Sequence, residues 1–122
     1  MTIEQAINRL DERKQNIYSR EEKIKWLSQI DAEIYRKIMQ THEGCPAGWV
    51  PYTEAADIKR ELLAGEPWDE MYIHWLESRV DYYDKEFGEY NNSYSAFASV
   101  YGDYARAYNR EHMPVQRRSR FF

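Results

Sequence analysis

The chain has little cysteine and glycine and no long apolar run. Cys45 is the only cysteine, so no disulfide forms within one chain, and a reducing cytoplasm is the expected compartment. No apolar stretch approaches the ~20 residues of a membrane helix, and the N-terminal sequence MTIEQAINRL lacks the apolar core of a secretion signal. The glycines are scattered and form neither GxGxxG nor GxxxxGK, which excludes the common phosphate-binding loops.

Length and charge narrow the class of protein further. A chain of 122 residues fits one domain, and its net charge of −4 argues against general affinity for nucleic-acid phosphates. Positive charge is concentrated near the end, where Arg117, Arg118 and Arg120 precede Phe121 and Phe122. These residues either dock onto an acidic partner or form a solvated terminus. Docking is slightly favoured, because two exposed phenylalanines are costly in water.

Helical spacing dominates the rest of the sequence. Thr2 and Gln5 have the spacing of a capping box, which predicts a short helix after Thr2. Ser19 and Glu22 repeat this pattern before an apolar face, which predicts a helix over about 20–41.

Glycines and prolines mark where the predicted helices stop. Four of them, Gly44, Pro46, Gly48 and Pro51, fall within the sequence EGCPAGWVPY at 43–52 and predict a loop over 44–52. Residues 53–63 are predicted to be either a helical turn or partly extended. Pro67 suits the first position of the next helix. A break is predicted near 84–88, and the last helix is predicted to end before Pro114.

The predicted fold is therefore all-α. It is a small helical bundle with two N-terminal helices, a Pro/Gly loop and a long C-terminal helical hairpin. Residues 1–114 form the single predicted domain, and residues 115–122 form an extended basic tail.

Seven aromatic residues alternate at spacings of three and four near the C-terminus. This aromatic seam consists of Phe87, Tyr90, Tyr94, Phe97, Tyr101, Tyr104 and Tyr108. Its spacing is that of a helix seam, and helical stripes are usually core. Tyrosine hydroxyls need water or a partner, however, so part of the seam is also suited to a wet interface between subunits.

The two halves of the seam have different neighbours in the sequence. We expect the half from Phe87 to Phe97 to pack on the preceding helix. Small residues flank the half from Tyr101 to Tyr108, so we expect that half to contact a neighbouring subunit. The predicted subunit-interface residues are Tyr101, Tyr104, Tyr108 and, in the Pro/Gly loop, Trp49.

Chemically reactive side chains are sparse. His42 and Cys45 supply two potential metal ligands, whereas zinc sites use three or four protein ligands. A Cys–His nucleophile is an alternative, but no oxyanion element supports it. Adjacent carboxylates such as Glu21 and Glu22 lie at helix starts, where the helix dipole explains them. We predict no catalytic, cofactor-binding or metal-binding residue and no enzyme activity.

Two segments on either side of the Pro/Gly loop resemble a family of short proteins from tailed bacteriophages. They are YSREEKIKWLSQIDAEIY and EPWDEMYIHWLESRVDYYDKEFGEYNNSYSAFASVYGDYARAYNREHMP, and the likeness covers roughly residues 2–114. Its most specific parts are Tyr90-Asn91-Asn92 and the run from Tyr108 to Pro114. The family is encoded among head and neck genes, mostly in phages of Gram-positive hosts. It resembles head–tail connector, or adaptor, proteins.

The resemblance implies a structural virion protein that is small and all-helical. Such adaptors form a ring beneath the portal, with its twelvefold symmetry, and the genome passes through the centre during ejection. They grip the portal through C-terminal segments. For this chain the implied portal-docking residues are Arg117, Arg118, Arg120, Phe121 and Phe122.

The resemblance also implies the partners and the location. The expected partners are the portal protein, neighbouring copies in the ring and a downstream neck or tail protein, which the loop 44–52 is placed to contact. DNA passes through the channel without specific binding. The expected location is the neck of the virion, after assembly in the host cytoplasm.

A small helical nucleic-acid-binding regulator is the alternative function. It predicts a basic recognition helix. The most basic predicted helix, over 20–41, carries Arg20, Lys23, Lys25, Arg36 and Lys37, but it also carries Glu21, Glu22, Asp31 and Glu33. This mixture favours the adaptor.

Overall fold

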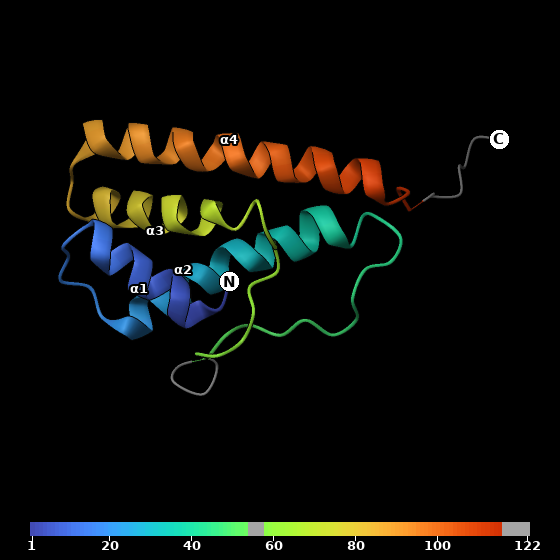
Figure 1. The fold of residues 1–122 in the computed structure, drawn as a ribbon, viewed down its shortest axis with the longest axis horizontal. Coiled ribbons are helices and arrows are strands. Elements are labelled where there is room, and N and C mark those ends of the chain that lie inside the picture. Colours follow the sequence, from blue (N-terminus) through green and yellow to red (C-terminus); the bar gives the residue numbers. More distant parts are fainter. Residues whose placement is uncertain (54–57, 116–122) are drawn as a thin grey trace.

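Four α-helices form most of the chain that the structure, a computed structural model, describes: residues 1–53 and 58–115 (Figure 1). They are α1 (Ile3–Arg13), α2 (Arg20–Ile34), α3 (Glu70–Tyr83) and α4 (Phe87–Glu111). A π-helical turn, η1 (Tyr35–Met39), continues α2. These residues form isolated β-bridges but no strand, so the predicted all-α helical bundle is confirmed.

The two N-terminal helices begin at the residues that the sequence indicates. Thr2 Oγ1 accepts a hydrogen bond from Gln5 N–H at 3.1 Å, and Gln5 Oε1 accepts one from Thr2 N–H at 2.8 Å, which confirms the capping box. Ser19 Oγ accepts from Glu22 N–H at 3.1 Å and caps α2. These three bonds satisfy backbone donors that a helix start leaves unpaired.

The helix predicted over about 20–41 is present, but its end is not α-helical. Gln40 N–H donates to the Tyr35 carbonyl at 2.9 Å, which is the five-residue spacing of a π-turn. Ile38 and Met39 stay buried through this turn. Apolar spacing alone does not distinguish one such turn from an α-turn, so the sequence did not predict it.

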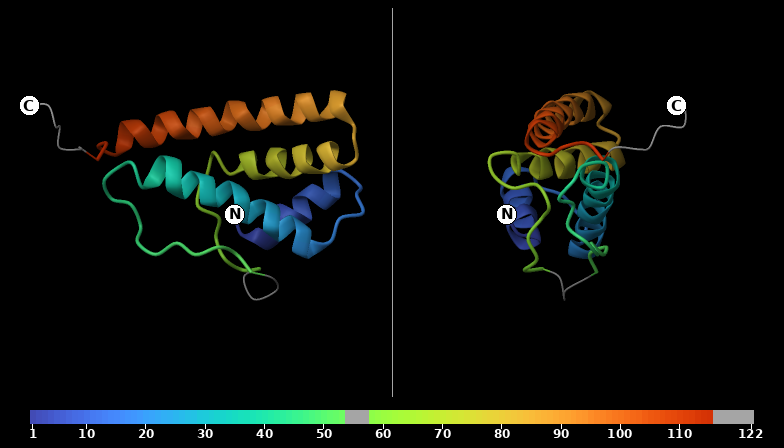
Figure 2. Two further views of the ribbon diagram at one scale, coloured as in Figure 1. Left: turned by 180° about the vertical axis from the view of Figure 1, so that it is seen from behind. Right: turned by 90° about the vertical axis from the view of Figure 1, so that its right-hand side faces the viewer.

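Helix α3 lies in the middle of the bundle. Figures 1 and 2 show α4 running antiparallel along one side of α3, with α1 and α2 side by side on the other. The side chains of Met71, Tyr72, Ile73 and Leu76 are fully buried as a result. Because α3 is covered on both sides, its apolar residues are not confined to one face of the helix.

The turns around α3 differ in how well they were predicted. The break near 84–88 is confirmed, and Lys85 adopts the left-handed conformation there with φ of 63°. Pro67 is not the first residue of α3, which begins at Glu70. Instead, Trp68 N–H donates to the Gly65 carbonyl at 2.9 Å, and this bond closes a turn before the helix.

In the described part of segment 53–63, residues 58–59 form a turn and Glu61 forms an isolated antiparallel bridge with Thr2, which agrees with the predicted extended piece at 61–63. Ile3 N–H donates to the Arg60 carbonyl at 3.0 Å, and Leu62 N–H donates to the Met1 carbonyl at 3.0 Å. The segment therefore satisfies its backbone groups by lying against the start of α1.

The carboxylate of Asp31 joins α2, α3 and the loop between them. It is fully buried and accepts hydrogen bonds from the Tyr52 hydroxyl, from the Tyr72 hydroxyl at 2.6 Å and from Leu63 N–H at 3.0 Å. The Tyr72 hydroxyl accepts a further bond from Ala64 N–H at 2.8 Å. Burial raises the pKa of Asp31 to about 6, although these hydrogen bonds favour the charged form and oppose the shift.

The predicted division of the aromatic seam holds only in part: Phe97 is buried against Trp75 of α3 as expected, but other residues of both halves differ from the prediction. Tyr104 and Tyr108, expected on an outer surface, are only 5% and 8% exposed, whereas Phe87 and Tyr94, expected to be packed, are 55% and 40% exposed. The reason is that η1 and the segment before α3 cover the second half of α4, where Trp68 packs on Tyr104 with ring centroids 5.8 Å apart.

Replacing Phe97 with alanine should lower the free energy of unfolding by about 3–5 kcal/mol, because its ring is 4% exposed and packs on Trp75. Phe87→Ala is the matched control on the same helix, with an expected loss below about 1 kcal/mol. Urea titration of both variants measures the difference. Equal losses would contradict the burial described for the seam.

Replacing Asp31 with asparagine should change how stability depends on pH. The native pKa lies above the unfolded value of 3.8, so native Asp31 binds a proton more tightly between about pH 4 and 6. The free energy of unfolding of the unmodified protein, minus that of Asp31→Asn, should therefore fall as pH rises through this window.

The measurement for Asp31 is urea titration at several pH values. At pH 7 the asparagine should cost about 1–3 kcal/mol, because its amide hydrogens face the Tyr52, Tyr72 and Leu63 donors. Asp103→Asn, which removes an exposed carboxylate from α4, is the control. A difference that rises with pH would show that Asp31 does not titrate as described.

Candidate functional site

The end of α4 is tied to the segment that follows η1. We call this the exit junction and define it as residues 41–44 together with 108–115. Glu43 N–H donates to the Met113 carbonyl at 2.7 Å, and Val115 N–H donates to the Thr41 carbonyl at 2.8 Å. His42 and Pro114 face each other between these bonds, so the missing N–H of proline leaves no acceptor unpaired.

His42 links the two segments of the junction to the helices on either side. Its Nδ1 lies 2.7 Å from the Ile38 carbonyl oxygen. Its Nε2 lies 2.8 Å from Asn109 Oδ1, and its ring stands edge-on to Tyr108 at 5.4 Å. Both ring nitrogens of His42 are thus engaged within the chain.

His112 and Gly44 close the other side of the junction. The His112 ring stacks on Tyr108 with centroids 3.8 Å apart and planes 13° apart, and its Nδ1 lies 3.1 Å from the Tyr108 carbonyl. Gly44 has φ of 80°, and a Cβ there would lie 3.5 Å from the His112 ring. Glycine is therefore favoured here by the backbone turn, whereas a Cβ would only reach ordinary van der Waals contact with His112.

The pairing of His42 with Cys45 as metal ligands is not formed. The Cys45 thiol donates to the Pro46 carbonyl at 3.3 Å, and His42 is held by Ile38 and Asn109. Over residues 1–53 and 58–115, no group of three or more His, Cys, Asp or Glu side chains is placed to hold a metal ion.

The residues predicted to contact neighbouring subunits pack mainly on their own chain. Tyr104 and Tyr108 are core residues, as described above. Trp49 is half-buried between Tyr35 and Tyr52, with ring centroids 5.8 and 5.5 Å away. Burial also raises the pKa of the partly exposed Tyr101 to about 12. Tyr101 and Trp49 thus keep only part of their surface for another molecule.

The predicted portal-docking residues lie outside the described part of the chain. They are Arg117, Arg118, Arg120, Phe121 and Phe122. The structure describes the tail only at Val115, which is still bonded to Thr41. The exit junction therefore fixes the position and direction from which residues 116–122 continue.

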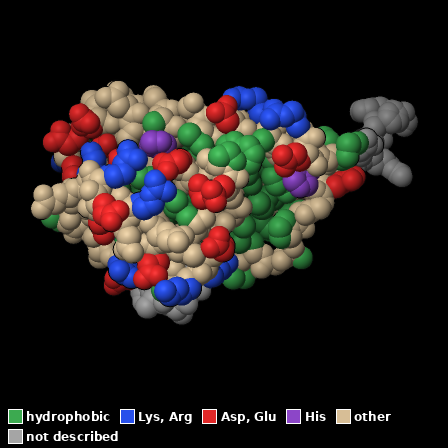
Figure 3. Space-filling model, in the orientation of Figure 1, with side chains coloured by type: hydrophobic (Ala, Val, Ile, Leu, Met, Phe, Trp, Pro, Cys, Tyr) green, Lys and Arg blue, Asp and Glu red, His purple; other side chains and the backbone are tan. Residues whose placement is uncertain are grey.

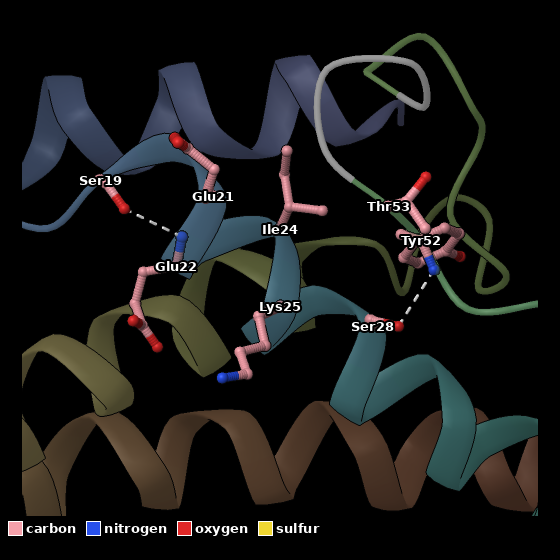
Figure 4. A pocket seen from close by; sticks show the side chains of 8 residues that line it. All are labelled: Ser19, Glu21, Glu22, Ile24, Lys25, Ser28, Tyr52 and Thr53. Carbon is pink, nitrogen blue, oxygen red and sulfur yellow. Dashed lines mark hydrogen bonds between the residues drawn. The ribbon is translucent and has the colours of Figure 1, made fainter.

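One open hollow of about 660 Å³ lies beside the start of α2 (Figure 4). Both serines in its lining already have partners: Ser19 Oγ accepts from Glu22 N–H, and Ser28 Oγ accepts from Tyr52 N–H at 3.1 Å. The side chain of Lys25 points away from both serines (Figure 4). No acid, base and nucleophile converge within this lining.

Basic side chains on α1 and α2 are largely paired with acids. Arg9 bonds Glu70 at 2.6 Å, and Lys23, only 5% exposed, bonds Asp11 at 2.7 Å. Figure 3 shows positive and negative side chains interspersed on one face of the molecule, around an apolar area. Such a face offers no continuous basic stripe for a nucleic-acid backbone.

A buried ion pair also connects three helices. Asp81 of α3 is 3% exposed, and its carboxylate accepts from Lys14 Nζ at 2.7 Å and from Ser93 Oγ at 2.8 Å. The hydrogen bond with Asp81 raises the pKa of Lys14. These contacts connect the end of α1 and the start of α4 to α3, so they serve the fold.

Comparisons with protein-family models, with curated proteins and with solved structures find no match for the chain. Among the described helices, none combines the length and the apolarity needed to cross a membrane.

Sequence reasoning named several residues of the exit junction without predicting their contacts. His42 was considered as a metal ligand, and the run from Tyr108 to Pro114 was noted only for its resemblance. The missed contacts join residues 67 positions apart, such as His42 and Asn109. The sequence did contain one signal for these contacts: polar and aromatic side chains occur together at both predicted helix ends, near residue 41 and before Pro114.

Replacing Asn109 with alanine should loosen the exit junction without unfolding the bundle. The loss of its bond to His42 should cost about 1 kcal/mol and should raise the exchange rates of the Glu43 and Val115 amides several-fold. Hydrogen exchange followed by NMR measures both amides. Asn91→Ala, on the exposed face of the same helix, is the control and should leave both rates unchanged.

Proposed function

We propose that this protein is a head–tail adaptor of a tailed bacteriophage. In this proposal it is a non-enzymatic ring subunit that docks under the portal, links the capsid to the neck or tail and forms part of the DNA channel. The observation that carries the proposal is the exit junction, because the residues that resemble the phage family most specifically, 108–114, are the ones that build it.

The exit junction suits a docking role for the tail. A segment that grips a partner binds more tightly when its base is held in place, because less conformational entropy is lost on binding. Two backbone hydrogen bonds and the stacked rings of His112 and Tyr108 hold that base here. The arginines and phenylalanines that follow supply bidentate hydrogen bonds and apolar anchors for a portal subunit.

The rest of the surface supports a passive channel wall. A net charge of −4 and the pairing of basic residues such as Arg9 and Lys23 weaken attraction to DNA, which must slide through the ring. In the proposed virion neck, the long helices form the wall, neighbouring copies close the ring, and the loop 44–52 faces a neighbour or the tail-side protein.

The tail is the part of this proposal that mutagenesis tests most directly. Deleting residues 116–122 should leave the thermal transition unchanged, because Val115 keeps its bond to Thr41, and should abolish binding to the portal. Replacing Arg117, Arg118 and Arg120 together with alanine should weaken binding at least about tenfold. Portal pull-down and electron microscopy of neck assembly are the measurements.

A charge-matched variant controls for the loss of positive charge. Lys25, Arg36 and Lys37 are exposed on α2 and η1, and replacing these three with alanine should leave portal binding intact. Normal assembly of particles with the truncated protein would exclude the docking role. A salt-sensitive shift of DNA by the isolated protein would instead favour the nucleic-acid-binding alternative.

A further inference from the structure

A small aromatic pocket lies at the opposite end of the bundle from the exit junction. Tyr18, Trp26 and Tyr83 form three of its walls, Glu22 forms the fourth, and its volume is about 150 Å³. Tyr83 stacks on Trp26 with planes 5° apart, and Tyr18 stands edge-on to Trp26 at 5.3 Å. The contacts between these rings hold the side chains in place, so the pocket is preformed.

The lining predicts what the pocket binds. A cavity of this volume accommodates one benzene-sized ring. Glu22 adds a negative charge at the wall, and Asp84 lies beside it, accepting from the Tyr18 hydroxyl at 2.6 Å. Tyr83 and the neighbouring Ile17 are 53% and 91% exposed, so further apolar surface adjoins the opening. The pocket therefore fits an aromatic side chain with a cation next to it in sequence.

The chain itself contains such a segment. Arg120 directly precedes Phe121 and Phe122, and Arg117 and Arg118 lie just before them. We propose that the pocket receives Phe121 or Phe122 from a second copy of this chain, with Arg120 paired to Glu22 or Asp84. The second phenylalanine then lies against Ile17.

The tail of the same copy is too short to fill the pocket. Tyr83 of the pocket is the last residue of α3, next to the α3–α4 turn, and Figure 1 shows this turn at the opposite end of α4 from the helix end that leads to Val115. Helix α4 contains 25 residues, so it is about 37 Å long. Phe122 is seven residues beyond Val115, and seven residues span at most about 25 Å when fully extended. The contact is therefore between copies.

Rings at this end of the bundle already bind a guanidinium group. The Cζ atom of Arg79 lies 4.4 Å from the centroid of the Trp75 ring and 5.7 Å from that of Tyr90. Aromatic rings next to the pocket, though not its own lining, therefore already contact an arginine.

The contact uses two different surfaces, a tail on one copy and a pocket on the next. Such a heterologous contact generates closed rings or open chains of subunits, because each copy binds the next copy with its tail and a previous copy with its pocket. It goes beyond the proposed adaptor function and concerns the protein without any portal. In the proposed neck, the portal and the pocket compete for the same tail.

The test compares self-association of the unmodified protein with that of one tail variant and two pocket variants, all full-length, by sedimentation velocity from micromolar to millimolar concentration. The unmodified protein should associate as concentration rises. A tail variant, Phe121→Ala with Phe122→Ala, and a pocket variant, Tyr83→Ser, should each associate at least about tenfold more weakly. Glu22→Lys is a second pocket variant that leaves all the rings in place, and thermal unfolding checks that each variant is folded.

Mixing the variants gives the decisive result. The tail variant retains a pocket and the pocket variant retains a tail, so an equimolar mixture should form one-to-one dimers and nothing larger. Phe87→Ala, which removes an exposed ring outside the pocket, should associate like the unmodified protein. The proposal is overturned if the mixture stays monomeric, if the unmodified protein does not associate, or if the tail variant associates normally.

Discussion

The buried carboxylate of Asp31 is the interaction on which the arrangement of the chain depends. The segment between η1 and α3 is long and contains no helix in its described residues, so its backbone groups need partners from elsewhere. The two carboxylate oxygens of Asp31 accept hydrogen bonds from Tyr52 and Leu63 of that segment and from Tyr72 of α3. A single charge thereby fixes the segment against two helices, and burying it without these donors would be strongly unfavourable.

With the segment fixed, the two ends of the bundle take on different properties. At one end, η1 and the segment before α3 cover the second half of α4, and His42 and His112 complete the exit junction. At the other end no segment among residues 1–53 and 58–115 covers the start of α4 in this way, and Tyr83 and Phe87 stay half exposed. Both surfaces proposed for assembly follow from this asymmetry.

Local sequence signals predicted the elements well and their contacts poorly. The cap at Thr2 and the break near Lys85 depend on neighbouring residues, so they could be read from the sequence. The burial of Asp31 depends on Tyr52 and Tyr72, which are 21 and 41 positions away, and it could not. The burial of Tyr104 and Tyr108 was not predicted, because regular spacing does not say which turns of a helix another segment covers.

The bridge between His42 and Pro114 also bears on the order of folding. It closes a loop that contains more than half of the chain, and closing so long a loop is entropically costly unless other contacts have already shortened it. The packing of α4 on α3 and the hydrogen bonds to Asp31 shorten the length of free chain in this loop. We therefore expect the contact between Thr41 and Val115 at the base of the tail to form late, after the interior of the chain is assembled.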